Sequence, residues 1–122
     1  MIGIDIVEIE RIEKLILSNK NFLTRIFTEN EIKYFKSKKF KYQTIAGNFS
    51  AKEAISKALG SGIRDFSFKD IEVLRDELGC PYVRVYNNLE KIINDREIKD
   101  IKVSISHSKN YAVANSLLIF RK

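Results

Sequence analysis

Helical and strand patterns are segregated along this chain of 122 residues, and that segregation constrains its fold most. Helical patterns dominate the first half; the longest spans residues 42–59 and ends at Gly60 and Gly62, where glycine can terminate a helix. Strand patterns dominate the second half. Helices that precede strands indicate an α+β fold with antiparallel connections. No repeat or linker interrupts the sequence, so we expect a single domain over residues 1–122, with N-terminal helices packed on an antiparallel sheet.

Local patterns predict the individual elements. Strands are expected at residues 2–7, 71–75, 82–86, 101–107 and 111–120, with turns at Gly79-Cys80-Pro81 and Ser108-Lys109-Asn110. Besides the helix at 42–59, helices are expected around Ile9, Ile12 and Ile16, at residues 29–37, and around Leu89, Ile92 and Ile93. Thr28 and Glu31 have the spacing of a capping box, and Asn87 or Asn88 is expected to cap the last helix.

The chain is basic, with 22 Lys and Arg residues against 16 Asp and Glu residues and a net charge of +6. The segment Lys36–Lys41 alone holds four lysines in six residues. Such a charge suits an anionic partner, which could be nucleic acid, a phosphate-rich cofactor, an acidic protein or a membrane surface. Lysines that serve solubility alone are the alternative interpretation.

The single cysteine, Cys80, excludes an internal disulfide framework and suits a reducing compartment. The N-terminal sequence MIGIDIVEIE has acidic residues where a signal peptide requires basic ones, and no stretch approaches transmembrane length. We therefore expect a cytoplasmic location and no membrane partner.

Glu53 and Lys57 are the first candidates for chemistry, because residues four apart in a helix lie on one face. They share the side opposite to the predicted core face, which is formed by Ala51, Ile55, Ala58 and Leu59; Ala46, Phe49 and Ser56 lie on their side. An exposed ion pair is the simpler interpretation of the two charges. Phe49 beside Glu53 nevertheless indicates that this face also meets something, for example a partner subunit or a ligand.

Asp5 is the next candidate, because it interrupts an Ile-rich strand where a lone carboxylate would be costly to bury. It either lies on a wet face or caps the following helix, or it binds a cation. Two carboxylates with phosphate oxygens and waters would suit Mg²⁺, and a nearby lysine could neutralise a phosphoryl leaving group.

His107, the only histidine, shares strand parity with Val103 and Ile105, so a place in the core or at the strand end explains it most simply. Its flanks Ser104, Ser106 and Ser108 supply hydroxyls that could hold phosphate. A zinc site is not expected from one histidine and one distant cysteine. Gly60-Ser61-Gly62 follows a helix, so it is not a dinucleotide-binding loop.

Four segments together resemble the holo-acyl-carrier-protein synthases: GIDIVEIERI (3–12), FTENEI (27–32), AGNFSAKEAISKALGSGI (46–63) and SISHSKNYAVA (104–114). DIEVLRDELGCPYV (70–83) is similar to the central hairpin of that family, so the resemblance spans nearly the whole chain. It implies the 4'-phosphopantetheinyl transferase fold. It also implies transfer of 4'-phosphopantetheine from coenzyme A to a serine of apo acyl carrier protein, with adenosine 3',5'-bisphosphate as the second product, in fatty acid biosynthesis.

The same resemblance implies residue roles. Asp5 and Glu53 would bind Mg²⁺, and Glu53 would also position or help deprotonate the attacking serine. Lys57 would balance charge on the leaving group. Lys57, Ser106 and His107 match positions along the coenzyme A site.

The resemblance also implies partners. Arg11 matches a basic residue that docks acidic carrier proteins, and Arg25 is expected to assist it, which would give the basic charge a purpose. Family members of this length are similar in forming homotrimers whose active sites are shared between adjacent protomers, which would explain the apolar residues beside Glu53.

One position departs from the family pattern: Asn48 stands where the family usually has an arginine. A cation that could contact a coenzyme A phosphate or a structural acid is missing there. The segment Lys36–Lys41 could substitute electrostatically, although lysine lacks the bidentate geometry of arginine. The departure bears on coenzyme A affinity more than on the reaction type.

Two alternatives remain from the sequence. A basic nucleic-acid-binding module would use Lys36–Lys41 with Tyr34, Phe35 and Phe40, and its binding would be indifferent to Asp5→Ala or Glu53→Ala. It would leave the matching segments unexplained, so no nucleic-acid partner is expected. A catalytically dead relative would share the fold without turnover, and the intact set of Asp5, Glu53 and Lys57 argues against it.

Overall fold

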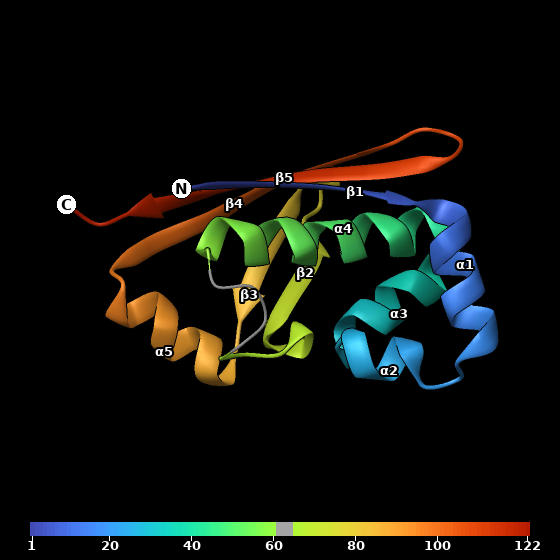
Figure 1. Ribbon diagram of the computed structural model, residues 1–122, viewed down its shortest axis with the longest axis horizontal. Helices are drawn as coiled ribbons and strands as arrows, with labels where there is room; N and C mark the ends of the chain where they lie inside the picture. The colour runs from blue at the N-terminus through green and yellow to red at the C-terminus, as the bar shows by residue number, and fades with distance from the viewer. Residues whose placement is uncertain (61–64) are drawn as a thin grey trace.

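The structure is a computed structural model that describes residues 1–60 and 65–122. Its centre is helix α4 (Tyr42–Leu59), which lies against one face of a three-stranded antiparallel sheet in the order β1-β5-β4 (Figure 1). The strands of this sheet are β1 (Ile2–Glu8), β4 (Ile98–His107) and β5 (Tyr111–Phe120). The expected α+β architecture with an antiparallel sheet is confirmed.

Two groups of elements cover the side of α4 that faces away from this sheet (Figure 1). Near the N-terminal end of α4 lie α1 (Ile9–Ser18), α2 (Phe22–Ile26) and α3 (Glu29–Ser37). Near its C-terminal end lie the hairpin of β2 (Ile71–Arg75) and β3 (Pro81–Val85), the short 3₁₀ helix η1 (Phe68–Asp70) and α5 (Asn87–Asp95). Strands β2 and β3 form a separate two-stranded antiparallel sheet.

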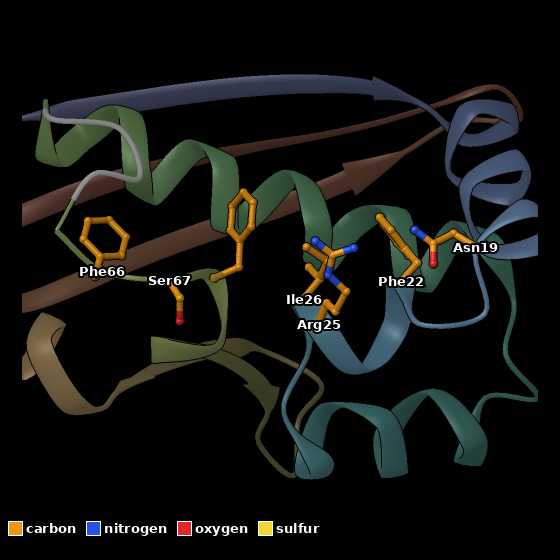
Figure 2. A pocket seen from close by; sticks show the side chains of 7 residues that line it. Asn19, Phe22, Arg25, Ile26, Phe66 and Ser67 are labelled. Atoms are coloured by element: carbon orange, nitrogen blue, oxygen red, sulfur yellow. The ribbon is translucent and has the colours of Figure 1, made fainter.

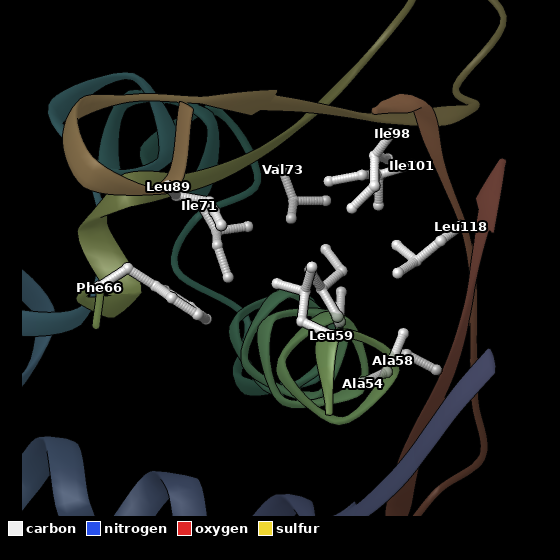
Figure 3. Close-up of a cluster of buried hydrophobic side chains, with 13 residues drawn as sticks. Ala54, Ala58, Leu59, Phe66, Ile71, Val73, Leu89, Ile98, Ile101 and Leu118 are labelled. Carbon is white, nitrogen blue, oxygen red and sulfur yellow. The ribbon is translucent and has the colours of Figure 1, made fainter. Parts of the chain in front are cut away.

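Each group of elements has its own hydrophobic core. One core joins Phe22 of α2, Phe27 directly after α2 and Phe35 of α3 to Phe49 of α4. The other joins the C-terminal half of α4 to the hairpin, α5 and the sheet, and Figure 3 shows Leu59 facing Ile71, Val73 and Leu118 there. Helix α4 contributes to both cores, and so does strand β5 through Ala112 and Ala114, so these two elements link the two groups.

Strand β1 approaches α4 unusually closely, and Gly3 makes this possible. A Cβ atom at Gly3 would meet the carbonyl oxygen of Ala54 and lie 2.6 Å from the backbone nitrogen of Ala58. Glycine is needed where another backbone comes this close. The same inward face of β1 carries Asp5, whereas the isoleucines of β1 point to the open face of the sheet, where Ile4 is 62% exposed.

Helix α4 is buried on nearly every side. Within residues 45–59, all of which the structure describes, every residue except Glu53 and Lys57 is buried. The expectation that the face of Phe49 meets something is confirmed, but the suggested partner subunit or ligand is wrong for Phe49 itself. Phe49 packs on Phe22 and Phe68 of its own chain, at ring-centroid distances of 6.1 and 5.8 Å. A helix with neighbours on every side needs apolar residues around its whole circumference. The polarity of its residues is therefore a poor guide to which face of α4 points to the core.

Most predicted boundaries are confirmed. Helix α3 has its capping box, with Thr28 and Glu31 each accepting a backbone N–H of the other, and α4 ends at Gly60 in the left-handed conformation. Gly62 lies outside the described residues. The expected cap of α5 is wrong, because Tyr86 precedes its first turn while Asn87 donates to Asp70.

Two short elements, α2 and η1, were not predicted, and β4 begins three residues before the expected strand, across an irregularity between Ile98 and Asp100. No helix in the described part of the chain is both long and apolar enough to cross a membrane.

Candidate active site

Asp5 and Lys57 meet where the inward face of β1 crosses α4. Lys57 Nζ lies 3.2 Å from Asp5 Oδ1 and also donates to the carbonyl oxygen of Ile4 at 3.1 Å. Ser50, almost two turns earlier on α4, donates to Asp5 Oδ2 at 3.2 Å or to the Asp5 carbonyl at 3.0 Å. The Asp5 side chain is only 14% exposed, so it lies neither on a wet strand face nor at a helix cap. Its charge is met by a lysine and a hydroxyl, as a buried carboxylate requires.

Glu53 belongs to the same cluster, one turn before Lys57. Burial and the negative charge of Asp5 raise the pKa of Glu53, whereas Lys57 and Arg11 oppose this rise. Two carboxylates that repel each other at a half-buried position are a common feature of functional sites. The structure therefore brings Asp5, Glu53, Lys57 and Arg11 together, although these residues come from β1, α1 and α4.

The donor set of this cluster fits a hard cation. Among the residues that the structure describes, no group of three or more Asp, Glu, His or Cys side chains could hold a metal unaided. Mg²⁺, however, commonly takes one or two carboxylates and completes its shell with water and substrate phosphates. The mutual repulsion between Asp5 and Glu53 is the observation that favours a cation here, since a bound cation would offset it.

His107 lies elsewhere. It shares a cavity of 220 Å³ with Ile105, as expected from strand parity, and the lining includes Tyr34, Gln43 and Arg75. Ser106 points to the opposite, open face of the sheet, where it lines a shallow pocket with Ile4 and Asn115. The structure therefore does not bring Ser106 and His107 together within one chain.

The His107 cavity and the acidic cluster are also separated from each other. Asp5 is on β1 and His107 on β4, which are the two outer strands of the sheet, and α4 packs between their inward side chains. A ligand that touches both groups in one chain would have to pass around α4. One chain alone therefore does not bring the acidic cluster and the His107 cavity to the same ligand by a direct path.

Arg25 lies in the last turn of α2 and lines a cavity of 380 Å³. Figure 2 shows Arg25, Ile26 and Phe22 of α2 on one side of this cavity, with Phe66 and Ser67 on the other. Arg25 is not among the groups that shift the pKa of Glu53, whereas Arg11 is. Of the two predicted docking residues, Arg11 is thus the one that the structure ties to the acidic cluster.

The sequence did not predict two contacts that α4 makes through Asn48 and Lys52. Asn48 Oδ1 accepts a hydrogen bond from Arg75 Nη2 at 2.9 Å, so a cation reaches position 48 from strand β2. Lys52 and Glu31 form a fully buried ion pair at 2.6 Å. The departure of Asn48 from the family pattern was a signal for the contact with Arg75. The ion pair had no such signal, because the sequence indicated Glu31 only as the partner of Thr28 in a capping box.

Comparisons with known proteins identify the relatives of this chain. A sequence model of the 4'-phosphopantetheinyl transferase superfamily matches residues 1–116. The chain is 58% identical over 117 residues to a holo-[acyl-carrier-protein] synthase of Clostridium botulinum, covering 96% of this chain and 94% of that relative.

Two solved structures illustrate the likeness of the fold. The Helicobacter pylori holo-[acyl-carrier-protein] synthase in complex with coenzyme A matches with a TM-score of 0.84 and 38% identity, over 97% of this chain and 99% of that chain. The Neisseria meningitidis holo-[acyl-carrier-protein] synthase matches with a TM-score of 0.89 and 33% identity, over 96% and 95% of the two chains.

Proposed function

Because the chain belongs to the holo-[acyl-carrier-protein] synthases of the 4'-phosphopantetheinyl transferase superfamily, we propose that Asp5, Glu53 and Lys57 carry its reaction with a bound Mg²⁺. The reaction is the transfer of 4'-phosphopantetheine from coenzyme A to apo acyl carrier protein. The burial of α4 supports this residue assignment. Between residues 45 and 59 only Glu53 and Lys57 are not buried, and both lie beside Asp5.

The chemistry follows from what these side chains can do. The carrier serine attacks the β-phosphate of coenzyme A, the bond from the β-phosphorus to the bridging oxygen breaks, and adenosine 3',5'-bisphosphate leaves with the negative charge. Such a transfer needs chiefly positioning and charge neutralisation. Glu53 accepts the serine proton, directly or through a water. Lys57, already paired with Asp5, balances the charge that develops on the leaving group.

Asp5 and Glu53 would hold the metal, which supplies charge neutralisation at the pyrophosphate oxygens when bound. Ser50 fixes Asp5 from α4 through its hydroxyl. These contacts hold the Asp5 carboxylate in place before the substrate arrives, which reduces the ordering that binding must impose.

We further propose that an acidic carrier protein docks at Arg11, with Arg25 contributing. Support comes from the influence of Arg11 on Glu53, which places a docking cation within electrostatic reach of the reacting groups. Complementary charge would speed encounter. We also propose that the enzyme acts in the cytoplasm and that its product, holo acyl carrier protein, is used in fatty acid biosynthesis.

A homotrimer with shared sites completes the proposal. The open face of the sheet exposes four large apolar side chains, Ile2, Ile4, Ile6 and Leu117, and Ile2 pairs with Leu117 across two strands. Apolar side chains gathered on one exposed face suit a protein–protein contact. Ser106 lies on that same open face, beside Ile4. A second copy packed there would cover the isoleucines, and it could complete a site whose two halves lie on opposite sides of α4 within one chain.

The test is the intact mass of apo acyl carrier protein after incubation with the protein, coenzyme A and Mg²⁺. We expect a gain of one phosphopantetheine group that EDTA abolishes. Asp5→Ala and Glu53→Ala should each abolish the gain while the circular dichroism spectrum is retained. Glu10→Ala is the matched control, because Glu10 forms an exposed ion pair with Lys14 on α1, and it should react like the wild type. Wild-type rates in Asp5→Ala would remove Asp5 from the site.

A further inference from the structure

Lys57 occupies the place beside Asp5 that a bound cation would need. Lys57 Nζ lies 3.2 Å from Asp5 Oδ1, and the Ser50 hydroxyl lies 3.2 Å from Oδ2, so each carboxylate oxygen already has a polar neighbour. Ser50 is fully buried and reaches Asp5 from inside the fold. Lys57, whose side chain is 55% exposed, reaches it from the solvent side. The ammonium group therefore shields this carboxylate from ions in solution.

The contact between Lys57 and Asp5 can be exchanged without leaving the lysine unpaired. Its Nζ atom also donates to the carbonyl oxygen of Ile4 at 3.1 Å, and its exposed side chain is open to water. Lysine carries its charge at the end of a flexible four-carbon stem, so the ammonium group can move to a new anion. The pair that Lys52 of the same helix forms with Glu31 is the opposite case, because both side chains are fully buried. Of the two lysines of α4, Lys57 is thus the one that can change its partner.

The cluster of Asp5, Glu53, Lys57 and Arg11 is electrically balanced without a metal, since it contains two acids and two bases. Burial raises the pKa of Glu53, and Lys57 and Arg11 oppose this rise, so both cations act on the carboxylates. With a divalent cation alone, the cluster would carry an excess of positive charge. It also offers only two carboxylates, and no third metal-binding side chain gathers with them among the described residues. The phosphates of coenzyme A would supply both the missing negative charge and further oxygen ligands.

We propose that Lys57 competes with the metal for Asp5: it holds the carboxylate in the free enzyme and moves to the phosphates of coenzyme A when metal and coenzyme A bind together. This inference rests on the proposed function, from which it takes both ligands. A metal that binds alone must displace Lys57 into water, whereas coenzyme A offers the displaced lysine an anion. Each ligand therefore raises the affinity for the other, because coupling between binding sites is reciprocal. Lys57 thereby makes metal binding depend on the substrate.

Mn²⁺ binding, measured without any carrier protein, tests this competition. Mn²⁺ takes the same kinds of oxygen ligand as Mg²⁺, and electron paramagnetic resonance counts the free ion directly, with coenzyme A alone as the blank. In the wild type, saturating coenzyme A should tighten Mn²⁺ binding about 5- to 150-fold. Lys57→Met should bind Mn²⁺ alone at least about 5-fold more tightly than the wild type, so coenzyme A should add correspondingly less. Its turnover should nevertheless fall, because the cation for the leaving group is missing.

Two further variants separate competition from other effects of the substitution. Lys57→Arg keeps a cation beside Asp5, so its affinity for Mn²⁺ alone should stay close to that of the wild type. Lys14→Met is the matched control, since Lys14 also pairs with a carboxylate at 3.2 Å, that of Glu10, but does not act on Glu53. It should change the affinity for Mn²⁺ by no more than about twofold. Circular dichroism spectra check that all three variants are folded.

The outcomes distinguish this inference from the proposed function. Unchanged or weaker binding of Mn²⁺ alone in Lys57→Met overturns the competition, even if the wild type modifies its carrier protein. Equal tightening in Lys57→Met and Lys57→Arg, or wild-type binding of Mn²⁺ that coenzyme A does not tighten, also overturns it. Tighter binding in Lys57→Met alone supports the competition even if the wild type shows no turnover, and only the proposed function then fails.

Discussion

Lys52→Met tests whether the buried ion pair between α3 and α4 stabilises the fold. Lys52 Nζ donates to Glu31 Oε1 at 2.6 Å and to the carbonyl oxygens of Ile26 and Phe68 at 2.8 and 3.0 Å. Both charged side chains are fully buried. Burial raises the pKa of Glu31 and lowers that of Lys52, and the attraction within the pair opposes both shifts. The two residues are thus charged groups that tolerate burial because each has the other.

The expected cost follows from what the substitution leaves behind. Methionine fills much of the lysine volume but makes none of the three hydrogen bonds, so Glu31 and two carbonyl groups stay buried with fewer partners. Removing one member of a buried pair typically costs about 3–5 kcal/mol. We expect a loss of that size in urea unfolding at one fixed protein concentration. Since whole domains are stable by only about 5–15 kcal/mol, the variant should melt far below the wild type.

A double-mutant cycle between Lys52 and Glu31 tests whether the loss comes from the interaction between the two side chains. Glu31→Gln removes the charge but keeps one acceptor, so Lys52→Met combined with Glu31→Gln should be more stable than the sum of the single losses predicts, by about 1–3 kcal/mol. Lys14→Met, in the exposed pair with Glu10, is the control and should change stability by no more than about 0.5 kcal/mol. Additive losses, or a Lys52→Met cost below about 1 kcal/mol, would refute the reasoning.

Three further changes test other contacts. Gly3→Ala should destabilise the fold by about 3 kcal/mol or more, because its Cβ would collide with the backbone of α4; in Gly47→Ala only a side-chain contact at 3.0 Å must yield, so its melting temperature should fall much less. Thr28→Ala should cost about 1–3 kcal/mol in urea unfolding, because it removes the cap of α3 and a 2.6 Å hydrogen bond to buried Glu72. Ile4→Lys should convert the proposed trimer to monomers with an unchanged circular dichroism spectrum, as measured by light scattering; an unchanged trimer would place the interface elsewhere.

Local signals explain why most elements could be predicted. The capping box at Thr28 and the left-handed glycine at residue 60 define helix ends through nearby atoms, so they can be recognised without the rest of the fold. Helix α2 and η1 are different: they are too short to show periodicity, and Phe22 and Phe68 both pack on Phe49 from distant parts of the sequence. Their existence depends on tertiary packing.

The same distinction applies to the candidate site. Helical spacing placed Glu53 and Lys57 on one face, but it could not show that the rest of that face is buried by other elements of the chain, among them α2 and η1. Asp5 joins them because β1 crosses α4, and Gly3 was the one local signal of such a close approach. Arg75 meets Asn48 across 27 residues of sequence, a contact that no periodic pattern encodes.

The position of α4 between the acidic cluster and the His107 cavity has a genetic consequence if copies share their sites. Two defective alleles could then rescue each other, one encoding Asp5→Ala and the other His107→Ala, with coenzyme A kept scarce. In randomly mixed trimers made from equal amounts of both chains, about one quarter of the sites would combine an intact cluster with an intact cavity. A chain that worked alone would show no rescue, so recovered activity in co-expressed mutants would report directly on which surfaces face each other across subunits.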